Sequence, residues 1–225
     1  MTIKSQTDKV FGVVNHACHK IGRSPESVSV IAVTKYVDHK VASQLVEAGV
    51  RHIGENRVDQ FLEKYEALKA NDNELTWHLI GSLQRRKVKD VINLVDYFHA
   101  LDSIKLAQEI QKRAQHKIKC FLQVNISGET TKHGFSIEEL EDALPELEQC
   151  DHIEIVGLMT MAPFGANETT LVNIFRQTKL LQETLRDRRI KNMPMTELSM
   201  GMSSDYQLAI QEGATFVRIG TAFFN

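Results

Sequence analysis

The sequence predicts an α/β fold, a single (β/α)8 TIM barrel with an extra N-terminal helix. Three observations predict it. Short β-branched runs recur along the chain, segments of helical period separate them, and the 225 residues match the roughly 200 to 250 that one such barrel needs. Strands that alternate with helices pair in parallel, and eight of them can close without an exposed edge. An open doubly wound sheet is the alternative architecture.

The elements follow one another in a regular order. A helix is expected from Ile3 to Gly22, ahead of the apolar first strand V-S-V-I-A-V-T. The predicted strands are short runs rich in β-branched or aromatic residues: Val28–Thr34, His52–Gly54, Trp77–Gly81, Tyr97–Leu101, Lys119–Ile126, Ile153–Met159, Glu197–Met200 and Phe216–Gly220. The predicted helices between them are amphipathic: Lys40–Ala48, Val58–Leu68, Ile104–Ala114, Ile137–Leu147, Leu171–Leu185 and Ser204–Gln211. No Pro-, Gly- or Ser-rich linker interrupts this order, so residues 1–225 are expected to form one domain.

The charge of the chain is nearly balanced. A net charge of -2, from 27 Lys and Arg against 29 Asp and Glu, gives no overall field that would attract nucleic acid or an anionic membrane. The basic residues cluster once, at Arg85, Arg86, Lys87 and Lys89. The apolar residues among and after them recur at helical spacing: Val88, Val91, Ile92 and Val95. This pattern favours a solvated helix face, with a binding patch as the alternative.

Cysteine usage and hydropathy bear on the compartment. Cys18, Cys120 and Cys150 are widely spaced and odd in number, which fits neither a disulfide framework nor a zinc site and indicates a reducing compartment. The N-terminal segment is polar, and no apolar run approaches the roughly 18 residues that a membrane span needs. We therefore expect a cytoplasmic protein. We also expect a monomer, because the sequence shows no large exposed apolar stripe.

The first predicted strand ends at a lysine. In a parallel barrel the loops that leave the carboxyl ends of the strands carry the chemistry, and Lys35 follows the apolar residues Ile31 to Val33. A lysine held near the barrel interior loses water from its ammonium group. This favours the neutral, nucleophilic amine, which can condense with an aldehyde. A lysine that reaches solvent or pairs with a carboxylate is the alternative.

The segment after the seventh strand is rich in hydroxyls and small residues. Its residues are Ser199, Met200, Gly201, Met202, Ser203 and Ser204. Backbone N–H groups and a helix N-terminus can bind a dianion there. Gly220 and Thr221 follow the last strand, and they complete the phosphate site that barrels often build after strands seven and eight. A simple helix N-cap at Ser203 or Ser204 is the alternative.

Three further side chains are candidates for the barrel mouth. Arg218 stands in an apolar strand, where its charge needs a partner. If Arg218 points inward, it could donate to a ring nitrogen of a cofactor. That nitrogen would stay unprotonated, because a guanidinium cannot accept a hydrogen bond from it. An ion pair with Glu197 or Asp205 is the alternative. His78 is either a satisfied core or lining residue or a base. Met159 is predicted to pack or to line a pocket, and no cluster of residues has the spacing of a metal site.

Motifs in a fixed order cover most of the chain. They are A-V-T-K ending at Lys35, I-G-E-N-R ending at Arg57, W-H-L-I-G-S-L-Q ending at Gln84, V-N-I-S-G-E-T-T-K-H-G-F ending at Phe135, V-G-L-M-T-M ending at Met161, L-S-M-G-M-S-S-D ending at Asp205 and V-R-I-G-T-A-F-F ending at Phe224. With these motifs the sequence closely resembles the pyridoxal phosphate homeostasis protein family, stand-alone barrels similar to the N-terminal domain of alanine racemase. The departures from the family's usual residues lie beside the expected pocket, at Val37, Asp38, Arg57 and Arg86.

The resemblance implies a cofactor and a role for several residues. It implies that pyridoxal 5'-phosphate (PLP) is held as a Schiff base on Lys35. It implies that Asn56, His78 and Met159 line the pocket and that Arg218 faces the pyridine nitrogen. Ser199, Gly220 and Thr221 would then reach the phosphate. Together with the segment after the seventh strand, the predicted cofactor-binding residues are Lys35, Asn56, His78, Met159, Ser199, Met200, Gly201, Ser203, Arg218, Gly220 and Thr221.

Three interpretations of the function follow, and the first two belong to different classes. The resemblance favours a protein of intracellular PLP homeostasis, which buffers the cofactor and delivers it to PLP-dependent apo-enzymes without turnover. The alternative is a PLP-dependent enzyme similar to amino acid racemases. Such enzymes add a second domain and a residue from a partner subunit, for which we expect no room here. A non-covalent binder of another phosphorylated metabolite is a third interpretation, and it predicts no imine at all.

Overall fold

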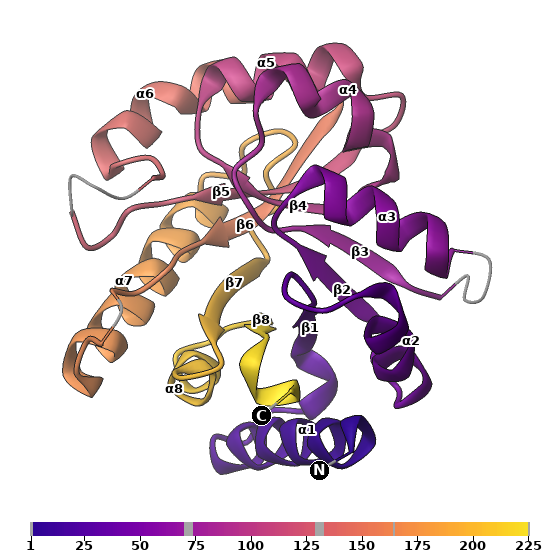
Figure 1. Ribbon diagram of the computed structural model, residues 1–225. Coiled ribbons are helices and arrows are strands. Elements are labelled where there is room, and N and C mark those ends of the chain that lie inside the picture. Colours follow the sequence, from indigo (N-terminus) through magenta and orange to yellow (C-terminus); the bar gives the residue numbers. More distant parts are fainter. Residues whose placement is uncertain (1, 70–73, 129–132, 164, 225) are drawn as a thin grey trace.

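Eight parallel strands close into a barrel. The computed structural model describes residues 2–69, 74–128, 133–163 and 165–224. Within these residues the strands pair in chain order, and the last strand pairs with the first (Figure 1). The predicted barrel is confirmed, because an open doubly wound sheet would leave two unpaired edges. Residues 129–132, which belong to the motif that ends at Phe135, lie outside the described residues.

Strands and helices alternate along the chain, and the helices lie on the outside of the barrel (Figure 1). The strands are β1 Ser29–Val33, β2 His52–Glu55, β3 Thr76–Leu79, β4 Tyr97–Leu101, β5 Ile118–Gln123, β6 Ile153–Met159, β7 Glu197–Met202 and β8 Phe216–Ile219. The helices are α1 Ile3–Lys20, α2 His39–Glu47, α3 Val58–Leu68, α4 Val88–Val91, α5 Ile104–Arg113, α6 Ile137–Glu148, α7 Glu168–Asp187 and α8 Tyr206–Gln211. None of the described helices has both the length and the apolar character needed to cross a membrane.

Local contacts explain where elements differ from the predicted bounds. α7 begins at Glu168, ahead of the predicted Leu171, because the Asn167 side chain caps it by accepting the backbone N–H of the first turn. β7 continues to Met202, past the predicted end at Met200. This extension carries the end of the strand into the segment predicted to bind a dianion.

The basic cluster lies on a short 3-10 turn, Arg85–Lys87, and on α4. Arg85, Arg86 and Lys89 are exposed, whereas Val88 and Val91 are buried. The stretch is therefore an amphipathic segment with a solvated basic face, as the spacing predicted.

The extra N-terminal helix supports the end of the chain. The Thr2 side chain caps α1 by accepting the backbone N–H of Ser5 at 3.2 Å. α1 buries an apolar face that includes Val10 and Val14, and it packs against α8 and the final 3-10 turn, Thr221–Phe223 (Figure 1). α1 therefore supports α8 and the final 3-10 turn, the elements that follow β7 and β8, where the phosphate site is predicted.

The barrel interior is packed with rings. These rings contact one another across strands at centroid separations of 4.3 to 6.4 Å, and they belong to His52, His78, Tyr97, His99, Phe121 and Phe216. On β2 the interior position next to them is Gly54, where a Cβ would lie 2.6 Å from the Ile31 side chain. The interior is thus a filled core, and any ligand must bind above it, at the carboxyl ends of the strands.

Candidate functional site

Lys35 lies at the carboxyl end of the barrel, after β1 and beside β8. The two strands pair in parallel up to Ala32 and Ile219, so the residues that follow them lie at the same end. Lys35 is half-buried, and its Nζ lies 4.8 Å from the ring centroid of Tyr36, which is 82% exposed. The position is the predicted one. The expected withdrawal from water is only partial, because the side chain lies at the rim of the barrel.

A buried ion pair anchors the backbone on which Lys35 stands. Lys64 Nζ on α3 lies 2.5 Å from Glu55 Oε1 and donates to the Thr34 carbonyl at 2.7 Å. The Thr34 hydroxyl donates to the same carboxylate oxygen at 2.5 Å, and all three side chains are buried. The ends of β1 and β2 are therefore tied to α3. Sequence reasoning missed Lys64, although its helical spacing from Phe61 and Leu68 places it on the buried face of that helix.

Asn56 follows β2, where its backbone lies close to Gly81 in the loop after β3. Its Oδ1 is buried and has no hydrogen-bond partner among the residues that the structure describes. A Cβ on Gly81 would lie 2.2 Å from the Asn56 carbonyl oxygen, so the loop after β3 can pass this backbone only with glycine. The amide of Asn56 is consequently held at the barrel mouth, with an acceptor that none of the described protein groups satisfies.

The loops that leave β7 and β8 meet at the same end of the barrel. Ser203 Oγ accepts a hydrogen bond from the backbone N–H of Gly220 at 3.1 Å. Both residues are half-buried, and Thr221, which begins the final 3-10 turn, is exposed. Met200 is fully buried, and Gly201 adopts a φ of +93°. The two segments predicted to bind phosphate are thus brought together, with the half-buried Ser203 and the exposed Thr221 carrying hydroxyl groups at this end of the barrel.

The turn between β7 and α8 is organised by Asp205. Asp205 is the N-cap residue of α8, so neither Ser203 nor Ser204 has the capping role that the sequence left open. Its carboxylate accepts the backbone N–H of Met202 at 2.6 Å. Burial raises the pKa of Asp205, while this hydrogen bond and the charge of Arg218 act in the opposite direction.

Arg218 points into the barrel from β8. Its side chain is buried, and it donates through Nη1 to Ser199 Oγ at 2.6 Å and through Nη2 to the Thr160 carbonyl at 2.9 Å. These partners replace the ion pair with Glu197 or Asp205 that the sequence left as an alternative. Burial lowers the pKa of Arg218 to about 10, against the raising effect of Asp205, so the group stays charged near pH 7.

A chain of histidines lies behind Arg218. His78 contacts His52 at 3.0 Å and His99 at 2.9 Å, and His99 contacts the Ser199 hydroxyl at 2.8 Å. His78 is therefore a satisfied core residue, one of the two interpretations the sequence allowed. Sequence reasoning missed His99. The alternation along β4, which places it on the same face as Tyr97, is the signal that could have found it.

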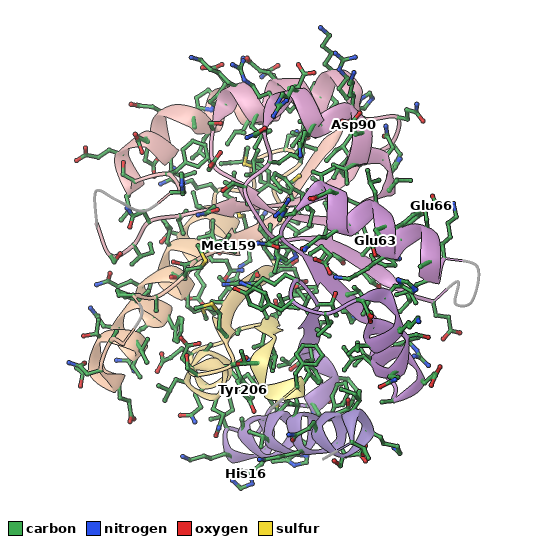
Figure 2. All side chains as sticks on the ribbon, in the orientation of Figure 1. His16, Glu63, Glu66, Asp90, Met159 and Tyr206 are labelled. Atoms are coloured by element: carbon green, nitrogen blue, oxygen red, sulfur yellow. The ribbon has the colours of Figure 1, made fainter. Side chains whose placement is uncertain are left out.

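Met159 ends β6 and is labelled in Figure 2. It is 1% exposed and pairs in register with Gln123 on β5 and Ser199 on β7. It therefore packs between its neighbours at the carboxyl end of β6, one of the two roles predicted for it, and the lining of a cofactor pocket stays a prediction.

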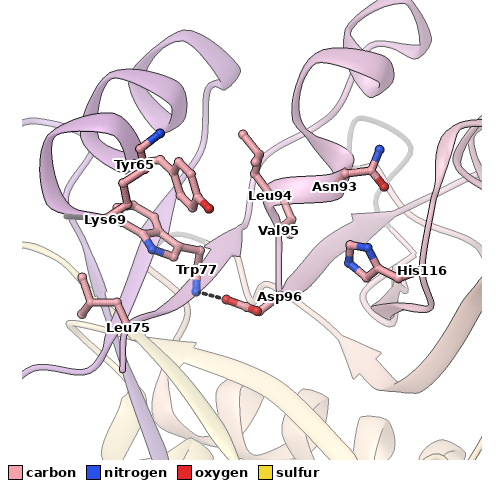
Figure 3. A pocket seen from close by; sticks show the side chains of 9 residues that line it. All are labelled: Tyr65, Lys69, Leu75, Trp77, Asn93, Leu94, Val95, Asp96 and His116. Carbon is pink, nitrogen blue, oxygen red and sulfur yellow. Dashed lines mark hydrogen bonds between the residues drawn. The ribbon is translucent and has the colours of Figure 1, made fainter. Parts of the chain in front are cut away.

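A separate cavity lies at the opposite end of the barrel. It has a volume of about 250 Å³, and Figure 3 shows the Asp96 carboxylate beside it, accepting the Trp77 backbone N–H at 2.7 Å. Its lining residues are Tyr65, Lys69, Leu75, Trp77, Asn93, Leu94, Val95, Asp96 and His116. None of the predicted cofactor-binding residues lines it. In the part of the chain that the structure describes, no three His, Cys, Asp or Glu side chains gather as a metal site would require.

Comparison with known sequences decides the family. The family model described as "Alanine racemase, N-terminal domain" matches residues 15–225. A protein of Aquifex aeolicus (strain VF5) named pyridoxal phosphate homeostasis protein is 38% identical over 227 residues, which cover 100% of this chain and 98% of that protein. The chain belongs to the pyridoxal phosphate homeostasis protein family.

Solved structures agree with this membership. The structure of PipY from Synechococcus elongatus, described as having PLP bound, is similar with a TM-score of 0.83 and 34% identity, covering 95% of this chain and 100% of that one. Alanine racemase from Corynebacterium glutamicum is similar with a TM-score of 0.73 at 15% identity, covering 99% of this chain and 60% of that one. The second likeness shows the shared barrel fold alone.

Proposed function

We propose that this protein binds pyridoxal 5'-phosphate through a Schiff base on Lys35 and takes part in intracellular PLP homeostasis by buffering and delivering the cofactor. Membership of a family whose members carry that name, and the PLP bound to PipY, support the proposal. The observation that carries it is geometric. A half-buried amine after β1 lies at the same barrel end as two loops joined by the hydrogen bond between Gly220 and Ser203.

The residues at this end fit the chemistry of the cofactor. When bound, PLP supplies an aldehyde that condenses reversibly with a lysine amine. The phosphate needs several hydrogen-bond donors, and Ser203 and Thr221 have hydroxyl groups there; the Gly220 N–H, which donates to Ser203 Oγ, holds the two loops together. Asn56 Oδ1, buried without a partner among the described residues, is an acceptor that a ligand hydroxyl could satisfy.

The chain's own residues would hold the ligand in distinct ways. Arg218 has N–H groups besides the two that bond to Ser199 and Thr160, and one of these would donate to the pyridine nitrogen. Met159 would pack against the ring, and Met200 and Gly201 would shape the loop after β7. His78 would support the ligand site from the barrel interior, through its hydrogen bonds to His52 and His99. The role of Ser199 at the phosphate stays a prediction, because its hydroxyl contacts His99 and Arg218 in this structure.

The experiment is reconstitution with PLP followed by borohydride reduction. We expect a yellow protein whose visible imine band disappears on reduction, with PLP then recovered covalently on the peptide that contains Lys35. Lys35→Ala should lack the band, and Lys40→Ala, at an exposed lysine on α2, should retain it. A protein that binds PLP equally well with and without Lys35 would contradict the proposed linkage.

We further propose that the role is carriage without turnover, by a monomeric, single-domain protein of the cytoplasm that passes PLP to apo-enzymes. The names of the relatives support a homeostatic role, and the three free, buried cysteines are compatible with a reducing compartment. The alternative is racemase-like activity. Incubation of the reconstituted protein with L-alanine distinguishes the two, because racemisation well above that of free PLP would favour the enzyme.

A further inference from the structure

Side chains in the barrel interior form one unbroken chain of hydrogen-bond contacts from β2 to β8. His52 Nδ1 lies 3.0 Å from His78 Nε2, and His78 Nδ1 lies 2.9 Å from His99 Nε2. His99 Nδ1 lies 2.8 Å from Ser199 Oγ, which accepts from Arg218 at 2.6 Å. The contact between β4 and β7 crosses the barrel, so the chain joins opposite walls of the core.

The donor and acceptor roles in this chain follow from the charges. Burial lowers the pKa of His78 and of His99 well below the ordinary value, and so does the positive charge of Arg218 at His99, so both rings are neutral near pH 7. A neutral imidazole has one donating and one accepting nitrogen. Because a guanidinium only donates, Ser199 Oγ must accept from Arg218. Its hydroxyl proton is then available to His99 Nδ1.

That choice sets the other protons. With Nδ1 accepting, His99 donates through Nε2 to His78, and His78 donates through Nε2 to His52. In the reverse arrangement His99 Nδ1–H would donate to Ser199 Oγ, which would then accept from both His99 and Arg218. The buried hydroxyl proton of Ser199 would lose His99 as its acceptor, and this disfavours the reverse arrangement. The three rings therefore have a single preferred set of tautomers.

We propose that His99 is a positioning residue for PLP, an inference that rests on the proposed function. By accepting the hydrogen bond of the Ser199 hydroxyl, His99 keeps Ser199 Oγ in place as an acceptor for one N–H group of Arg218. The Thr160 carbonyl accepts a second N–H group of the same guanidinium. The remaining N–H groups of the guanidinium are left for the pyridine nitrogen. His78 and His52 act one step further back, because they fix the tautomer of His99.

Other titratable groups contact or act on members of this chain of hydrogen bonds. The charge of Asp96 opposes the lowering of the His52 pKa by burial, and Tyr97 stacks on His78 at 5.0 Å. Lys119 Nζ lies 3.4 Å from the Tyr97 hydroxyl, and the charge of Asp205 acts on Arg218. A pH profile of the intact protein reflects these groups too, so variants must be compared with the wild type at each pH.

Substitution of His99 tests the proposal. Phe121 stacks on the His99 ring at 4.3 Å, so His99→Phe can fill the site while removing both nitrogens. We expect it to weaken PLP binding about 10-fold, as the loss of a hydrogen bond to a positioned group does. We also expect the visible imine band to shift with pH across the neutral range, because a less constrained Arg218 would let the pyridine nitrogen take a proton. His99→Asn, which keeps an acceptor near the position of Nδ1, should restore affinity to within about 3-fold.

The outcomes separate this inference from the proposed function. The matched control is His16→Asn, at an exposed histidine on α1 (Figure 2), which should behave as the wild type. A wild type without the borohydride-sensitive band overturns the proposed function and this inference together. A normal wild-type band with unchanged affinity and pH profile in His99→Phe overturns this inference alone. If His99→Phe does not fold, Ser199→Ala must show the pH-dependent band, and a pH-independent band there overturns the inference as well.

Discussion

Removal of the buried amine of Lys64 should destabilise the barrel far more than removal of an exposed one. The Lys64 and Glu55 side chains are 3% and 0% exposed, and Glu55 Oε2 has no partner among the described residues. Lys64→Met would leave the carboxylate buried, with the Thr34 hydroxyl still donating to it. Loss of one partner of a buried ion pair costs about 3–5 kcal/mol. At this chain length each kcal/mol lowers Tm by about 2–4 °C, so we expect a fall of about 6–20 °C.

Calorimetry at pH 7 measures this fall, and a matched variant calibrates it. Lys69, which is 46% exposed and pairs with Glu66, lies just after α3, and Lys69→Met should cost no more than about 1 kcal/mol. The double variant Lys64→Met with Glu55→Leu should recover most of the loss, because no buried charge remains. The reasoning is refuted if Lys64→Met lowers Tm no more than Lys69→Met does, or if the double variant is as unstable as the single one.

Three further outcomes follow from the structure. A Cβ on Gly201, where φ is +93°, would lie 2.6 Å from a side chain of α8, so Gly201→Ala should lower the free energy of unfolding in urea by about 1–3 kcal/mol. The control is Gly12→Ala on α1, where nothing lies within 4 Å, and it should raise the free energy of unfolding by about 0.5–1 kcal/mol. Burial holds the pKa values of His78 and His99 below the 6.5 of a free histidine, so below pH 6.5 the unfolded chain binds more protons than the folded one. The free energy of unfolding should therefore decrease as the pH falls below 6.5, by up to about 1.4 kcal/mol per pH unit for each ring. In unfolding measured against pH, His99→Phe should make this decline shallower, and an unchanged slope would contradict the assignment. Burial also raises the pKa of the Cys120 thiol, so iodoacetamide should label it only after unfolding, and rapid labelling of the native protein would contradict its burial.

The repeating order of the chain by itself determined the fold. Each short β-branched run and each amphipathic segment reflects a local periodicity, and parallel strands linked by helices leave few ways to bury both. The place of Lys35 followed from the same logic, since a residue just after a parallel strand lies at the carboxyl end of the sheet. The meeting of the loops after β7 and β8, marked by Ser203 and Gly220, was predictable for that reason too.

Only the closed barrel decided which side chains meet across it. His99 and Ser199 are 100 residues apart in sequence, and no local pattern connects them; they meet because β4 and β7 face each other over the core. The partner of Arg218 was equally undetermined, because a buried guanidinium can donate to any nearby oxygen, and the register placed a hydroxyl and a carbonyl there. Periodicity tells which face of an element is buried. Hydrogen-bond partners depend on distances of a few ångströms between elements, and those exist only once the barrel has closed.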